Sequence, residues 1–267
     1  MRRYHLSGFL YAVWSFASSQ PVKFAMVPPL VDRTLVIPPV PAQPGAPEAP
    51  TWAECDAVIR RAYALSNELG DFLVGERLTG LRVSQVAGIR RRAIDPVRCT
   101  VQVEVGKSAA EQAEMRTVPV PRALIEVWMP RIAKLTDLPD ARLFDVAPDG
   151  ALVHDLWEDA EQAGEVRPNI VDPLSRRKGR PNHAFRAAYM AGLQALTVEI
   201  DGSPVQRVSD RVIDFLVGHR PMDTRARHYA PPTPAALVAA VGLVSPIDLQ
   251  AVAVADGSGG SVVKGPW

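Results

Sequence analysis

The stretch RVIDFLVGHRPMDTRARHYAPP, residues 211–232, predicts a short amphipathic helix, then a polar corner, then a tyrosine. Ser209 can cap the start of the helix, and Gly218 can end it in the left-handed conformation. His219 then lies just past the helix end, where an imidazole can face a polar site. The residues expected on the buried face recur at helical spacing and are Val212, Ile213, Leu216 and Val217.

Tyr229 closes this stretch among basic residues, namely Arg225, Arg227 and His228. Neighbouring cations favour the phenolate form of a tyrosine and also bind the phosphate that a phenolate can attack. The pattern therefore fits a tyrosine nucleophile acting on a phosphate. Taken alone, the stretch is better explained by an ordinary half-buried tyrosine beside a solvated basic face, so the rest of the chain has to decide.

Composition places the chain among ordinary globular proteins. It has 267 residues, of which 47% are hydrophobic and 22% charged, and its net charge is +1. This balance counts mildly against nucleic-acid binding, although local patches matter more than the total. Cys55 and Cys99 show neither disulfide pairing nor metal-ligand spacing, so we expect no metal site and a reducing, cytoplasmic setting.

The two ends of the chain differ from its middle. Residues 1–20 have a basic start and a short apolar run, the outline of a signal peptide. The run is interrupted and too short to cross a bilayer, so we interpret it as an amphipathic helix and keep a secreted protein as the alternative. Residues 21–50 are a proline-rich linker, residues 51–235 a folded domain, and residues 236–267 a helix followed by a disordered tail.

The folded domain is predicted to be mostly α, of the α+β class, with a small antiparallel three-stranded sheet. A capping box at Thr51 and Glu54 opens the first helix, and Ser84 is expected to cap the third. Pro130 should interrupt the helix of residues 122–135. Further helices are expected to end at Gly80, to run from Leu152 to Gly164, to run from His183 to Leu196, and to follow Pro232.

The sheet is predicted where the hydrophobic period changes from helical to alternating. Val97, Cys99, Val101, Val103 and Val105 alternate with polar residues, as in a half-buried strand. A turn should begin at residues 106–108. Residues 117–121 form a final strand whose prolines require an edge position.

Several polar residues fall at the ends of these elements. Arg82 follows a Thr-Gly-Leu corner, and Lys107 lies in the predicted hairpin turn. His183 and Arg186 are three residues apart, so they share a helix face away from the apolar one. Together with His219 and Tyr229, these are the groups that phosphoryl transfer through a phosphotyrosine needs. Arginine binds phosphate oxygens in a bidentate manner, and electrostatic stabilisation should dominate catalysis.

In this order the motifs resemble those of the tyrosine recombinases, the phage-integrase family of site-specific recombinases. TGLRVSQVAGIR (79–90) looks like the first arginine motif of the family, and HAFR (183–186) like its H-x-x-R motif. VIDFLVGHRPMDTRARHY (212–229) looks like the closing motif. The turn at Lys107 followed by RTVPVP (116–121) resembles the lysine hairpin. The resemblance covers about residues 51–235.

The resemblance implies a covalent mechanism without metal or nucleotide cofactor. Tyr229 would attack the scissile phosphate and form a 3′-phosphotyrosyl link, with His183 assisting proton transfer. Lys107 would protonate the departing 5′-oxygen. Arg82 and Arg186 would clamp the non-bridging oxygens. His219 would donate a hydrogen bond to the phosphate.

The resemblance also implies double-stranded DNA as the partner and a homo-oligomer, a synaptic tetramer, on it. The terminal helix is a candidate for docking between protomers. The side chains expected to contact DNA phosphates are Arg176, Arg177, Lys178 and Arg180 in a loop, and Arg225 and Arg227 beside the tyrosine.

Two departures from the family pattern keep an alternative open. Gln85 stands where the family usually has an acidic residue. A helical core-binding domain usually precedes the catalytic domain, and here only residues 1–20 resemble its final helix. The alternative is a truncated, catalytically incompetent DNA-binding remnant of an integrase.

Overall fold

The computed structural model describes residues 49–105, 114–145, 147–168, 181–200, 203–219 and 232–247. The chain divides into two compact units, Met1–Ala46 and Pro47–Trp267, and all described residues belong to the second. The helix predicted over residues 1–20 lies outside them, and the predicted domain boundaries stay predictions. Within the described ranges, every helix is too short or too polar to traverse a lipid bilayer.

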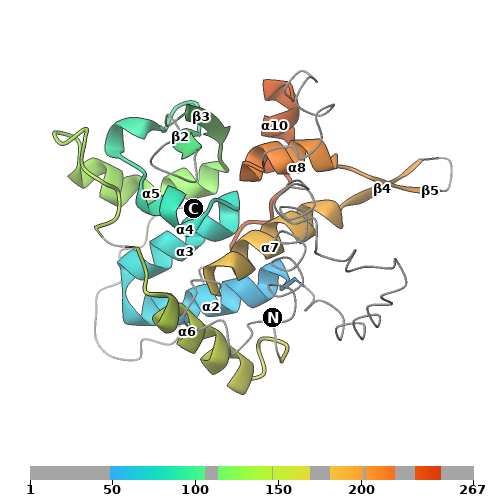
Figure 1. The fold of residues 1–267 in the computed structure, drawn as a ribbon, viewed down its shortest axis with the longest axis horizontal. Helices are drawn as coiled ribbons and strands as arrows, with labels where there is room; N and C mark the ends of the chain where they lie inside the picture. Colours follow the sequence, from blue (N-terminus) through green and yellow to red (C-terminus); the bar gives the residue numbers. More distant parts are fainter. Residues whose placement is uncertain are drawn as a thin grey trace, which may run out of the picture. The chain divides into compact units, whose positions relative to one another are not determined.

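The described part is mostly helical with a small antiparallel sheet, which confirms the predicted fold class (Figure 1). The helices are α2 (Trp52–Leu65), α3 (Asn67–Thr79), α4 (Val83–Ala87), α5 (Arg122–Lys134), α6 (Gly150–Gln162), α7 (Pro181–Gln194), α8 (Asp210–Val217) and α10 (Pro234–Val241). A 3-10 turn, Arg91–Ala93, follows α4. The strands are β1 (Ile94–Asp95), β2 (Thr100–Val105), β3 (Glu114–Pro119), β4 (Thr197–Ile200) and β5 (Ser203–Gln206).

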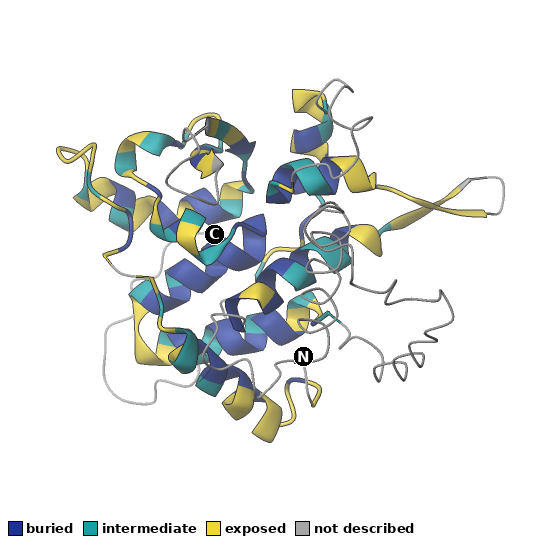
Figure 2. Cartoon of the chain, in the orientation of Figure 1, coloured by how far each residue is buried: buried dark blue, intermediate teal, exposed yellow. Residues whose placement is uncertain are grey.

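Helix α3 is the centre of the core. It packs against α2, α4, α5 and α7, and nearly all of its residues are buried, including the charged Glu76 and Arg77 (Figure 2). Because neighbours cover it on several sides, its pattern is not that of a one-sided amphipathic helix. The indole of Trp128 packs edge to face on Phe144, which in turn contacts Phe72 on α3.

Helix ends follow local sequence signals closely. Thr51 and Glu54 form the predicted capping box at the start of α2. Gly80 ends α3 with φ 63° and Gly218 ends α8 with φ 72°, the left-handed conformation that glycine adopts without strain. A Cβ on Gly80 would also lie 2.5 Å from the ring of Tyr189, so this corner is packed directly against α7.

Three predicted details of the helices are wrong. Arg82, not Ser84, is the N-cap of α4, because the helix starts two residues earlier than expected. Pro130 lies inside α5 without ending it; the residue is exposed, so solvent can hydrate the carbonyl that loses its donor. Leu196 lies beyond the end of α7 and is only partly buried.

The three-stranded sheet has the order β1-β2-β3 and is antiparallel throughout. Strand β3 is an edge strand, as its Pro119 requires, and Val103 on β2 pairs with Arg116 on β3. The prediction that the central strand includes Val97 is wrong. Val97 is 90% exposed in a turn held by the carboxylate of Asp95, which accepts from its backbone N–H.

Strands β4 and β5 form a second, two-stranded antiparallel sheet that the sequence pattern did not predict. The residues of this hairpin whose burial is described are exposed, so the hairpin lacks the one-sided alternation that is typical of a half-buried strand.

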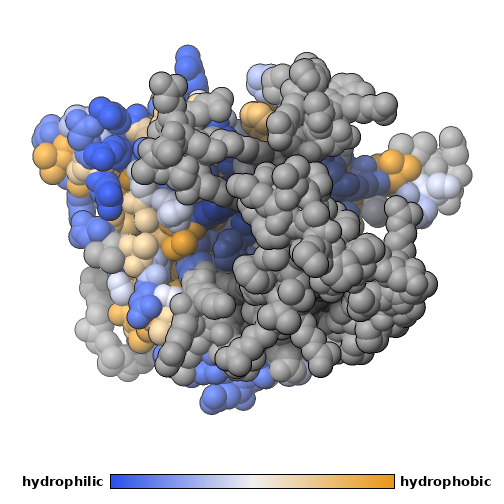
Figure 3. Space-filling view, in the orientation of Figure 1, coloured by the Kyte–Doolittle hydropathy of each residue, from blue (hydrophilic) through white to orange (hydrophobic). Residues whose placement is uncertain are grey.

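On the face drawn in Figure 3, hydrophilic and apolar side chains of the described residues are interspersed.

Candidate functional site

Four separate elements supply the described side chains of the site. Arg82 caps α4, Arg186 lies on α7, and His219 follows α8. Arg116 comes from the edge strand β3. Three of these were predicted as site residues, and Arg116 was not. The proximity of the arginines is visible in their electrostatics, because Arg82 lowers the pKa of both Arg116 and Arg186.

A hydrogen bond from the backbone of Arg82 fixes this residue and leaves its guanidinium available to the site. Its N–H donates to Oε1 of Gln85 at 3.0 Å, and Nε2 of Gln85 donates to the carbonyl of Glu104 on β2 at 3.0 Å. A carboxylate at position 85 could accept the first bond but not donate the second. Gln85 therefore ties the start of α4 to the sheet.

Arg186 is 6% exposed, although the helical pattern had placed it on a face open to solvent or site. Nη1 donates to the carbonyl of Gly80 at 2.8 Å, whereas Nη2 is buried without an acceptor among the described residues. Burial, followed by the charges of Arg82 and Arg116, lowers its pKa to about 10 against an opposing contribution from Asp214. The group is therefore cationic at neutral pH and retains a buried donor, a costly arrangement in a protein that binds nothing there.

His183 lies three residues earlier on the same helix and is exposed. It lines a small pocket together with Leu81, Arg82, Val83, Asn182 and Arg186. The pocket joins the first arginine motif to the H-x-x-R motif, as the sequence hypothesis expects. Arg82 and Arg186 therefore border the same pocket.

His219 is presented by the end of α8. Its backbone N–H donates to the carbonyl of Asp214 at 2.8 Å, and its Nδ1 lies 3.0 Å from Oδ1 of the same residue. The Asp214 carboxylate therefore holds the Nδ1 side of the ring, and Nε2 lies on the opposite side. Asp214 was missed in the sequence, although its spacing before a Gly-His pair at a helix end was a usable signal.

Arg116 was missed as well. Its two terminal nitrogens donate to the carbonyls of Phe215 and Leu216 at the end of α8, the second at 3.0 Å. Burial lowers its pKa to about 10, with a further contribution from Arg82. The signal that could have found it is the alternation of β3, which places Arg116 on the same face as the buried Val118.

The other predicted site residues lie outside the described residues. They are Lys107, Tyr229, Arg176, Arg177, Lys178, Arg180, Arg225 and Arg227. Their predicted roles stay predictions.

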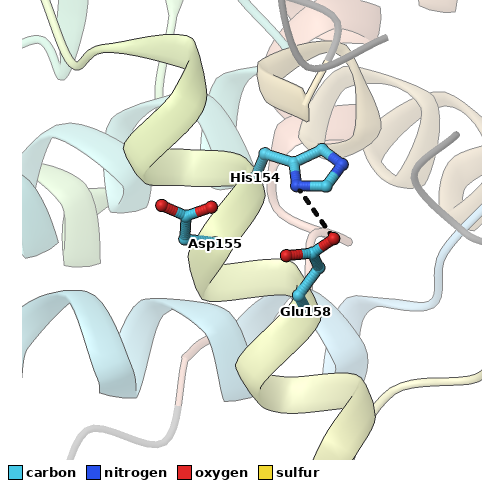
Figure 4. Close-up of side chains that lie close together, drawn as sticks. All are labelled: His154, Asp155 and Glu158. Carbon is cyan, nitrogen blue, oxygen red and sulfur yellow. Dashed lines mark ion pairs between the residues drawn. The ribbon is translucent and has the colours of Figure 1, made fainter. Parts of the chain in front are cut away.

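A separate group of potential metal ligands lies on α6, where ligand atoms of His154, Asp155 and Glu158 are within 4.8 Å of one another. The imidazole of His154 is buried, and its Nδ1 lies 3.5 Å from Glu158, the ion pair drawn in Figure 4. All three come from adjacent turns of a single helix, and Asp155 has an interaction of its own. An i, i+4 pair between the buried His154 and the exposed Glu158 explains this arrangement without a metal, and we assign none.

No family model matches the chain, and no curated protein matches it. Among solved structures, the chain is similar to a crystal structure of XerA recombinase, with a TM-score of 0.42 and 16% sequence identity. The alignment covers 69% of this chain and 60% of that one, so the chain spans less than two thirds of that protein. A likeness this distant carries no argument about the site, which has to be judged on its own geometry.

Proposed function

We propose that this chain is a site-specific DNA recombinase that cleaves and rejoins DNA strands through a 3′-phosphotyrosyl intermediate. The observation that carries the proposal is the gathering of Arg82, Arg116 and Arg186 from three elements beside His219. Like charges repel, so such a cluster is costly unless an anion binds there. Arg82 and Arg186 supply the donors for that anion, and a phosphodiester matches their bidentate geometry.

The chemistry follows from the side chains that the sequence adds to this cluster. The phenolate oxygen of Tyr229 attacks phosphorus, the bond from phosphorus to the 5′-oxygen breaks, and Lys107 gives that oxygen its proton. His219 and the two arginines stabilise the charged pentacoordinate transition state. The phosphodiester is conserved as a phosphotyrosine, so the reverse attack by a 5′-hydroxyl rejoins a strand without an external energy source.

Substrate and assembly are part of the same proposal. The partner is double-stranded DNA, with the basic loop of residues 176–180 contacting the backbone. Exchange between two duplexes requires several protomers, and α10 is a candidate surface for their contact because its Val238 is 60% exposed. Strand exchange on DNA presupposes that Tyr229 forms a covalent link to DNA, so this link is tested first.

The test uses a pool of nicked duplexes with a randomised centre, in which a cleaved strand loses a short 5′ fragment and cannot be rejoined. We expect a protein–DNA adduct that survives denaturation, and we expect Tyr229→Phe to abolish it. Tyr63→Phe is the matched control, because Tyr63 packs away from the site against Asp71 and should keep the adduct. Salt-sensitive DNA binding by all three proteins, without any adduct, would instead identify a DNA-binding remnant of an integrase.

A further inference from the structure

Arg116 differs from the other two arginines in what its guanidinium contacts. Both terminal nitrogens donate to main-chain carbonyls of α8, those of Phe215 and Leu216. These carbonyls belong to the last turn of α8, and that of Phe215 also accepts from the backbone N–H of Gly218 at 3.1 Å. The planar fork of an arginine satisfies two adjacent carbonyls at once, which a lysine ammonium on a flexible stem does not.

The fit of this contact extends to the residue before His219. A Cβ built on Gly218 would lie 2.8 Å from Nη2 of Arg116, closer than a side chain can approach. Position 218 therefore has two requirements, the left-handed conformation and an empty volume for the guanidinium. The Arg116 side chain is packed directly beneath the residue that precedes the imidazole.

The contact joins two parts of the proposed site that are far apart in the sequence. Arg116 pairs with Val103 across the β2–β3 ladder, so its backbone is fixed to the sheet. Leu216 and His219 belong to the end of α8, a hundred residues later. The position of His219 thus depends on the sheet through this one side chain, as well as on the packing of α8 against α7 and α10.

We propose that Arg116 is a positioning residue, which holds the end of α8 so that His219 faces the phosphate bound by Arg82 and Arg186. The assignment rests on the proposed recombinase function. Each terminal nitrogen directs an N–H group to a carbonyl of α8, so the role proposed for Arg116 is exerted through His219 rather than on DNA. Its Nε is buried without an acceptor among the described residues.

The test compares Arg116→Lys, which keeps the charge and loses the fork, with Arg98→Lys, whose side chain is 82% exposed in the turn before β2. Ring resonances of His219 are recorded in the free protein and assigned with His219→Gln. We expect the chemical shifts of these resonances to change in Arg116→Lys and to keep their wild-type values in Arg98→Lys. Unchanged His219 resonances in a folded Arg116→Lys protein would overturn the proposal.

Strand cleavage gives the second readout. With the nicked substrate at saturation, Arg116→Lys should slow adduct formation about 10- to 100-fold, the effect of misplacing a group by roughly 1 Å. The affinity for DNA should change less than about threefold. A loss that follows DNA affinity would overturn the proposal and make Arg116 a DNA contact. Arg116→Gln, which also loses the fork but leaves Gly218 unchanged, is the second variant should Arg116→Lys fail to fold.

The two readouts separate this inference from the proposed function. The resonances of His219 are measured without DNA and decide whether Arg116 positions the ring. If the wild-type chain forms no adduct while Arg116→Lys still moves those resonances, the recombinase proposal fails and the positioning contact stands. If the wild type forms a Tyr229-dependent adduct at a rate that Arg116→Lys leaves unchanged, the recombinase proposal stands and the positioning role fails.

Discussion

Nδ1 of His219 lies 3.0 Å from Oδ1 of Asp214, five residues earlier in the chain. An ionised carboxylate only accepts hydrogen bonds, so the ring hydrogen belongs on Nδ1 and Nε2 is the nitrogen left for a substrate. To donate a bond from Nε2 as well, His219 must carry both hydrogens. Asp214 therefore fixes the orientation of the ring that the proposed phosphate contact uses.

Replacing Asp214 tests this relationship. An asparagine amide both donates and accepts, so Asp214→Asn no longer specifies which ring nitrogen carries the hydrogen. We expect adduct formation to slow about 10- to 100-fold, as when partners that orient a functional histidine are removed elsewhere. Nitrogen-15 spectra of the His219 ring should show the change directly. Asp210→Asn, at the other end of α8, is the control, and equal effects of the two variants would contradict the assignment.

Arg186→Lys should lose the fork that reaches both Gly80 and a phosphate. Removing one donor that stabilises a charged transition state costs about 10²- to 10³-fold in rate, so we expect a loss of that size in adduct formation. The lost bond to the carbonyl of Gly80 should lower the free energy of unfolding by only about 1–3 kcal/mol. Rates measured with the nicked substrate and urea unfolding separate the two effects. A rate within about twofold of wild type would remove Arg186 from the site.

Glu76 gives the domain a pH dependence that can be measured without DNA. Burial raises its pKa to about 8, and the hydrogen bond from Asn182 only partly offsets this. The folded state therefore holds a proton that the unfolded state has released above its ordinary pKa of 4.5. The stability contributed by this proton is present below that value and is lost as the pH rises toward 8.

The measurement is urea unfolding of wild type and Glu76→Gln between pH 5 and pH 9. Each unit of pKa shift is worth roughly 1.4 kcal/mol, so the two curves should diverge by a few kcal/mol across this range. Glu76→Gln should become the more stable protein relative to wild type as the pH rises. Parallel curves would show that Glu76 is ionised in the folded state.

Glu54 should make the domain less stable as the pH falls, which is the opposite of the dependence expected from Glu76. Its burial raises the pKa, but hydrogen bonds donated to its carboxylate by Arg167 and Thr51 outweigh burial and lower it to about 2. The resulting stability is present above the ordinary pKa of 4.5 and is lost as the pH falls toward 2. Glu54→Gln should therefore be less stable than wild type at pH 7, with the difference vanishing near pH 2. Circular dichroism during urea unfolding at several pH values measures it, and a constant difference would contradict the assignment.

Local signals made much of this architecture predictable. Gly80, Gly218 and the capping box at Thr51 set helix ends through contacts within a few residues, and all three follow the sequence prediction. Pro119 of β3 correctly placed this strand at an edge. The prediction for Val97 was wrong because alternation does not show where a strand begins. The backbone N–H of Val97 donates to the carboxylate of Asp95 in an Asx turn instead of to a neighbouring strand.

Long-range contacts were not predictable in the same way. The helical phase of Arg186 showed which face it occupies but not that α3 and α8 cover that face. The bond from Arg116 to Leu216 joins residues a hundred positions apart, and no local pattern encodes it. Arg82, His183 and Arg186 line one pocket, and their roles there stay predictions. The contact between β3 and the end of α8, beside His219, was not predictable from the sequence.

The central claim is that Tyr229 is the nucleophile of a site built on Arg82 and Arg186. The most direct measurement is mass spectrometry of the adduct after trypsin and nuclease digestion. Residues 228–264 form one tryptic peptide in which Tyr229 is the sole tyrosine. We predict that this peptide carries a nucleotide linked through its 3′-phosphate to Tyr229. A nucleotide on any other residue, or an unmodified 228–264 peptide recovered from a denaturation-resistant adduct, would contradict the account.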